Sequence, residues 1–92
     1  MNKISNVKIQ QHGRELTDVT GANIELGNGE NIHVQNMAID QKADAMKNVT
    51  GLSVKADGTQ SAKLQGVQIK QPHGSVTISD DPNVEVTINK QG

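Results

Sequence analysis

The chain has 92 residues, a formal net charge of −1, and no Phe, Trp, Tyr or Cys. This length predicts a single domain, residues 1–92, and without aromatic side chains Ile and Val must form its core. Nucleic-acid binding is not expected because basic patches and stacking rings are missing, and the lack of cysteine excludes disulfides and thiolate metal sites.

One sequence motif recurs along the chain. The octet VTGANIEL (19–26) is echoed by VTGLSVKA (49–56), and half the spacing between them relates six octets. In chain order the octets occupy 4–11, 19–26, 34–41, 49–56, 64–71 and 79–86. The sixth position of each is apolar and β-branched: Ile9, Ile24, Ile39, Val54, Ile69 and Val84. The pattern predicts six strand-rich repeats of about 15 residues.

The third position of each octet carries a residue type that tolerates a left-handed backbone. These residues are Asn6, Gly21, Asn36, Gly51, Gly66 and Asp81. The first and fourth positions are mostly apolar, yet a regular strand would place them on opposite faces. A kink at the third position restores both to one side. On this interpretation Gly51 has a positive φ, and Gly51→Val should damage the fold.

Polar stretches follow the first five octets and predict turns. They occupy 12–15, 27–30, 42–45, 57–60 and 72–75. The third stretch lies within 40–48, which is rich in helix formers, so one helical turn and a plain loop are both compatible with it. The last octet departs from the pattern at Ser79 to Pro82, as a terminal repeat is expected to do.

The repeat predicts an all-β fold, either a β-solenoid or an intertwined β-helix, with an antiparallel β-meander as the alternative. Equal positions stack about 4.8 Å apart in a solenoid, whereas in a meander alternate strands reverse and equal positions separate. A column is defined here as the set of residues at one octet position. Because the residues within a column are similar, the solenoid is favoured, with one coil for each octet and the turn that follows it. The predicted core is Ile4, Val7, Ile9, Val19, Ile24, Val34, Ile39, Val49, Leu52, Val54, Leu64, Val67, Ile69 and Val84.

Residues capable of chemistry are scattered. His12, His33 and His73 contain no pair at metal-ligand spacing, so we expect them to be exposed, although copies of one histidine could meet on the axis of a trimer. Asp80 and Asp81 lack the spacing of a calcium loop and are expected in an Asx-type turn. No nucleophile elbow or phosphate loop occurs. We therefore predict no catalytic, cofactor-binding or metal site, and not an enzyme.

Val19-Thr20-Gly21 and Val49-Thr50-Gly51, with Leu64-Gln65-Gly66 as a looser copy, resemble the VxGxxxxx octets of tail-spike proteins. That family belongs to contractile phages and secretion-system needles. The resemblance implies a three-chain intertwined β-helix and a non-enzymatic structural role. Its His-x-His motif for an iron-loaded tip is missing here. Short coils and low aromatic content also fit bactofilin-like polymerising scaffolds.

The leading functional hypothesis is a self-associating spike, fibre or particle component, with a trimer as the favoured homo-oligomer. The alternative is a small adaptor or binding module that presents an exposed edge to a protein partner. No cofactor, nucleic acid or small-molecule substrate is expected, and membrane contact only if the protein is a spike. The N-terminal sequence MNKISNVKIQ has no apolar segment typical of a signal peptide, so a cytoplasmic or virion-associated location is expected.

Overall fold

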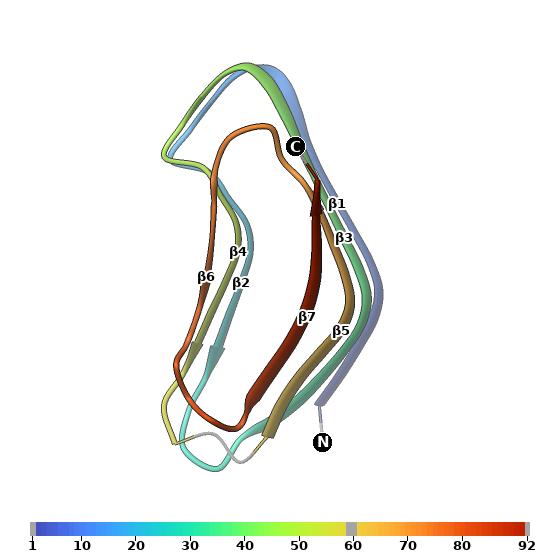
Figure 1. Ribbon diagram of the computed structural model, residues 1–92, viewed down its shortest axis with the longest axis vertical. Coiled ribbons are helices and arrows are strands. Elements are labelled where there is room, and N and C mark those ends of the chain that lie inside the picture. Colours follow the sequence, from blue (N-terminus) through green and yellow to red (C-terminus); the bar gives the residue numbers. More distant parts are fainter. Residues whose placement is uncertain (1, 59–60, 92) are drawn as a thin grey trace.

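The computed structural model describes residues 2–58 and 61–91, and within them the chain is all-β, with seven strands and no helix. The strands are β1 (Asn2–Thr17), β2 (Thr20–Leu26), β3 (Asn31–Lys47), β4 (Thr50–Ala56), β5 (Ser61–Lys70), β6 (Ser75–Ile78) and β7 (Val84–Gln91). Figure 1 shows them along the two sides of a flattened loop. The recurring β-branched residues favour this extended backbone.

The strands alternate between two parallel sheets. Sheet A has the order β1-β3-β5-β7 and sheet B the order β2-β4-β6, so each strand of one sheet is followed in the chain by a strand of the other (Figure 1). All strand pairs in the described part of the chain are parallel. The antiparallel meander is therefore wrong, and the all-β prediction is confirmed.

Strand pairing joins every second octet over most of the chain. Ile4 pairs with Val34 and Ile9 with Ile39 in sheet A, and Ile24 pairs with Val54 in sheet B. The prediction of one coil per octet is therefore wrong, because successive octets lie in different sheets and only alternate octets stack. The last full turn of the chain is shorter than the earlier ones. Ala62 pairs with Val84, although a separation of two octet spacings would place its partner further along the chain.

Two predicted turns are strands instead. Residues 12–15 and 42–45 lie inside β1 and β3, which stay in register through Gly13 with Ala43 and Glu15 with Ala45. A bent pair of strands keeps its hydrogen bonds at this corner, so neither a turn nor the helical turn at 40–48 forms. The stretch 27–30 does form a turn, and the stretch 72–75 begins with a bend but ends at Ser75, the first residue of β6. The predicted turn at 57–60 includes residues 59 and 60, which lie outside the described residues.

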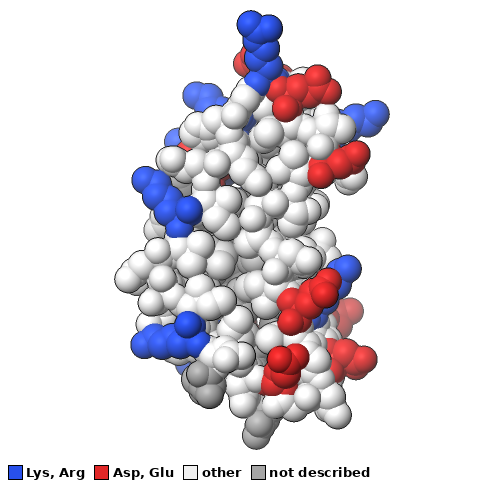
Figure 2. Space-filling view, turned by 180° about the vertical axis from the view of Figure 1, so that it is seen from behind, with Lys and Arg blue, Asp and Glu red and all other residues white. Residues whose placement is uncertain are grey.

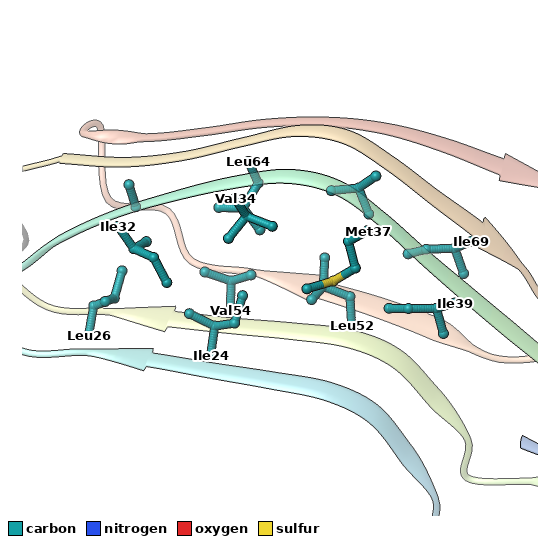
Figure 3. Close-up of a cluster of buried hydrophobic side chains, with 12 residues drawn as sticks. Ile24, Leu26, Ile32, Val34, Met37, Ile39, Leu52, Val54, Leu64 and Ile69 are labelled. Carbon is teal, nitrogen blue, oxygen red and sulfur yellow. The ribbon is translucent and has the colours of Figure 1, made fainter. Parts of the chain in front are cut away.

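The core lies between the two sheets, where apolar side chains of sheet A meet those of sheet B (Figure 3). Nine predicted core residues are buried: Ile24, Val34, Ile39, Val49, Leu52, Val54, Leu64, Val67 and Ile69. Four more are half-buried: Val7, Ile9, Val19 and Val84. The prediction was wrong for Ile4, which is 37% exposed because β1 ends the sheet. The prediction missed four buried residues: Leu26, Ile32, Met37 and Ala62.

The third octet position has two different roles. In sheet A, Asn6, Asn36 and Gly66 have φ of 58°, 59° and 65°, so the predicted kink is confirmed there. In sheet B, Gly21 and Gly51 are not among the residues with positive φ, and that part of the prediction is wrong. A Cβ on Gly21 would lie 2.6 Å from the Gly51 carbonyl oxygen. Glycine is needed in sheet B because the corner packs closely, not because of its φ. Asp81 also lacks a positive φ.

Candidate functional site

Three glutamines stack at the corner where β1, β3 and β5 bend or end. Gln71 Nε2 donates to Gln41 Oε1 at 2.9 Å, and Gln41 Nε2 donates to Gln11 Oε1 at 2.8 Å and to the Thr50 carbonyl oxygen at 3.1 Å. Gln41 and Gln71 are 0% and 1% exposed. The ladder therefore satisfies the buried amide groups of Gln41 and the Nε2 of Gln71, which gives it a structural role, whereas Gln71 Oε1 is buried without a partner among the described residues.

The sequence carried a signal for this ladder that the repeat analysis missed. The eighth octet position is Gln in 4–11, 34–41 and 64–71 but apolar in 19–26 and 49–56. This alternation distinguishes the octets of sheet A from those of sheet B, because it recurs in every second octet.

The three histidines are not brought together. His12 Nε2 lies 3.1 Å from Asp40 Oδ2 on the exposed side of sheet A. His33 Nε2 lies 3.2 Å from Gln65 Oε1, and His33 is half-buried, so the expectation that it is exposed was wrong. His73 is exposed in the bend before β6. Over residues 2–58 and 61–91, no group of three His, Asp or Glu side chains is arranged to hold one metal ion.

The carboxylates before β7 belong to a turn. Asp81 Oδ1 accepts a hydrogen bond from the Asn83 backbone N–H at 2.9 Å, and the Asp81 carbonyl oxygen accepts one from Val84 N–H at 3.0 Å. The Asx-type turn predicted at this position is confirmed. Its geometry fixes the entry of the chain into β7.

A depression of about 300 Å³ crosses sheet A next to the corner. Its lining combines apolar residues of sheet A, among them Ile9 and Ile69, with polar and charged ones, among them Lys8, Asp40 and Lys70, and contains no aromatic side chain. The volume is at the low end for ligand pockets, which are usually lined mainly by apolar and aromatic side chains. The ends of the sheets are the stronger candidate for a functional site.

Each sheet has two open edges, and the edges lie together at the two ends of the molecule. The N-terminal face is defined here as the outward edges of β1 and β2, and the C-terminal face as those of β6 and β7. No strand in the described part of the chain pairs with these edges. Unpaired edge strands present rows of backbone donors and acceptors, which are templates for another chain.

The N-terminal face is long and apolar at its centre. Its strands have 16 and 7 residues, against 8 and 4 on the C-terminal face. Ile4 is the exposed large hydrophobic residue of the described chain, and Val7 and Ile9 beside it are half-buried. Figure 2, which shows the side opposite to that of Figure 1, has a band of uncharged atoms across its middle with charged groups around it. This face is the candidate interaction site.

The C-terminal face is less open to pairing. Lys90 pairs with Ile69, so a lysine continues a column that is Ile9, Ile39 and Ile69 in the preceding strands. Its Nζ donates to the Gly74 carbonyl oxygen at 3.3 Å. Short edge strands and a charge in an apolar column are devices that discourage edge-to-edge association.

Comparison of the chain with protein-family models, with curated proteins and with solved structures found no match. Within the described residues, no helix of a length and hydrophobicity suited to crossing a membrane is present.

Proposed function

We propose that the protein is a non-enzymatic structural element, a β-solenoid that associates with further copies of itself in a spike, fibre or other particle. The observation that carries the proposal is the open N-terminal face, where the long edge of β1 adjoins an exposed Ile4. Burying that edge and that side chain against another copy removes apolar surface from water and satisfies backbone groups.

The solenoid part of the proposal is supported by the register. Parallel pairing of every second octet makes each pair of octets one turn of the chain, and like residues stack between turns, as Gln41 does on Gln11. The core lies between two sheets of the same chain. A solenoid formed by one chain therefore accounts for the packing without chains that intertwine.

The structural role is supported by how the polar residues are used. Asn36 Nδ2 donates to Asn6 Oδ1 at 3.4 Å, and Asn48 Nδ2 donates to Asp18 Oδ1 at 2.6 Å. These amide contacts join neighbouring turns, as the glutamine ladder does. The polar side chains that sequence repeats bring together are thus used to hold the stack.

A second candidate function is an adaptor that binds a different protein. The length of β1 favours it, because an exposed edge strand can accept an extended peptide from a partner by adding a strand to the sheet. In that case the partner would occupy the same N-terminal face.

Light scattering over a range of concentrations tests the proposal. The chain has a mass of 9.8 kDa. A mass of two or more chains that survives dilution supports self-association, three chains being the number implied by the tail-spike resemblance. A mass that grows with concentration indicates a polymerising scaffold. A monomer at all concentrations would overturn self-association and leave the adaptor.

A further inference from the structure

We propose that the N-terminal face pairs with the same face of a second copy, forming a two-fold dimer in which β1 of each copy runs beside β2 of the other. This inference rests on the proposed self-association and gives it a geometry. It is carried by the size of the face, the placement of its charges and the levels at which its side chains lie.

The face is large enough for a stable interface. The molecule extends 41 × 22 × 16 Å, and the strands of each sheet stack along the shortest direction, which is the line of view in Figure 1. The extents of this end, 41 × 22 Å, bound an outline of at most about 900 Å², which is the size range of the about 800 Å² that standard interfaces bury on each partner. An apolar centre within a charged rim also matches the anatomy of such interfaces.

Charge selects which strands meet. Lys3 and Lys8 alternate with the apolar residues of β1, and Glu25 in β2 with Glu30 after it lie on the opposite flank. Figure 2 shows basic groups along one flank of this face and most of the carboxylates on the other, where some basic groups also lie. A two-fold axis parallel to the strands places each lysine flank against the partner's acidic flank. An axis perpendicular to the sheets would instead bring lysine flank to lysine flank, which is repulsive.

The level of a side chain, meaning its position along the strand direction, gives the register in which β1 of one copy would pair with β2 of the other. Val34 faces Val54 and Ile24 across the core (Figure 3), and Ile4 lies in the column of Val34, so Ile4 is level with Ile24. The corner agrees, because a Cβ on Gly21 would be 2.9 Å from Ile39, which lies in the column of Ile9.

Rotation about an axis along the strands preserves these levels. Ile4 of one copy then lies beside Ile24 of the other, and Lys3 lies opposite Glu25 in each of two symmetric pairs. Because β1 and β2 run in opposite directions within one chain (Figure 1), the new strand pairs are antiparallel. Opposite charges placed directly across an antiparallel pair stabilise it.

Head-to-tail stacking of the C-terminal face on the N-terminal face fits less well. Lys90, in the apolar column, would face Ile9 of the next copy. The 4 residues of β6 would also have to cover the 7 of β2. A closed dimer avoids both mismatches, and two-fold dimers are the commonest closed assemblies.

Cysteine cross-linking tests the geometry, since the native chain has no cysteine. In the double variant Ser5→Cys, Asn23→Cys, the two thiols of one copy lie on different sheets. Across the proposed interface, the thiol at position 5 of one copy lies next to the thiol at position 23 of the other. We expect mild oxidation to give a covalent dimer on a non-reducing gel. The matched control is Gln35→Cys, Ser53→Cys, in the same columns one turn inward, where β1 and β2 cover the edges; it should not cross-link efficiently.

A third double variant, Ser5→Cys, Thr87→Cys, reports head-to-tail contact. Cross-linking of this variant, or of Ser5→Cys alone, in preference to the first pair would overturn the proposed geometry and leave self-association standing. A trimer in light scattering would do the same. Monomers at every concentration, without cross-links, would overturn both proposals.

A charge exchange gives an independent readout. Lys3→Glu and Glu25→Lys should each weaken the dimer at least tenfold at low salt, because each places like charges opposite one another. The double variant Lys3→Glu, Glu25→Lys should restore the affinity. Lys63→Glu, two turns away in the column of Lys3, is the control and should leave the dimer unchanged. Failure of the double variant to recover while the single variants weaken the dimer would overturn the pairing.

Discussion

Gln71 and Gln41 occupy the same position on successive turns of the chain, and the side-chain amide of Gln71 donates to Gln41 Oε1 at 2.9 Å inside the fold. Gln41 in turn donates to Gln11 and to the backbone of Thr50. Each turn thus provides the acceptor for the next one. A long polar side chain can be buried here because its amide finds a partner one turn away.

We expect Gln41→Met to lower the free energy of unfolding by about 1–3 kcal/mol, because it leaves Gln71 Nε2 and the Thr50 carbonyl oxygen without this partner while keeping the volume of the side chain. Urea unfolding measures the change. Gln11→Met is the matched control at the half-buried end of the ladder. A loss for Gln11→Met as large as that for Gln41→Met would show that the buried bonds of Gln41 to Gln71 and Thr50 are not the cause.

Ile39→Ala should cost about 2–5 kcal/mol, since Ile39 is 1% exposed and its loss opens a cavity between the sheets. Ile9→Ala, in the same column but in the edge strand, should cost about 1 kcal/mol, because Ile9 is only half-buried in the single chain. Urea unfolding at low protein concentration compares them. A small loss at Ile39 would contradict the register, and an equal loss at Ile9 would mean that another chain covers β1.

Gly51→Val should destabilise the protein by about 1–3 kcal/mol through overpacking. A Cβ there would lie 3.0 Å from Ile69 Cγ2 and 3.3 Å from Gln71 Nε2. The control is Gly13→Ala at the outer corner, where the nearest atom is 4.0 Å from the added Cβ; it should change the stability little. Thermal unfolding measures the loss of stability. An unchanged melting temperature for Gly51→Val would contradict the close packing.

Asn36→Val should cost about 1–2 kcal/mol, because Asn36 has a φ of 59° and a β-branched residue resists the left-handed backbone. Asn36→Gly should be nearly neutral, since glycine keeps the φ and loses only a long contact of 3.4 Å with Asn6. Comparing their melting temperatures separates backbone strain from the side-chain contact. Equal losses would assign the effect to the amide rather than to φ.

The strands and the columns could be predicted from the sequence because the apolar positions are regular. Residues such as Ile39, Val54 and Ile69 are buried as expected. The number of octets in one full turn of the chain could not be predicted from these columns. Both sheets face one core, so both require apolar residues at the same octet positions. The alternation of Gln with Leu26 and Ala56 at the eighth position separates the sheets, and Thr20 and Thr50 at the second position recur with the same spacing.

The reason for the small residue at the third position was also ambiguous. Glycine allows both a positive φ, as at Gly66, and a close approach, as at Gly21. Sequence alone does not distinguish these needs, although Asn6 and Asn36 pointed to the first in sheet A. An exposed edge was predicted as a surface for other chains, but the strand that forms it was not, because the residues of β1 match those of inner strands and only its position at the end of the sheet exposes them.

The wide offset between paired positions has a consequence for how the chain folds. Most strands pair with one that lies about a third of the chain length away. This separation exceeds the mean separation of contacting residues in slow-folding all-β domains, which is about 0.16–0.22 of the chain length. A large loop must close before the first pair of strands forms. We therefore expect refolding to be slow, and while β3 is still unpaired the apolar face of this long strand is exposed to aggregation.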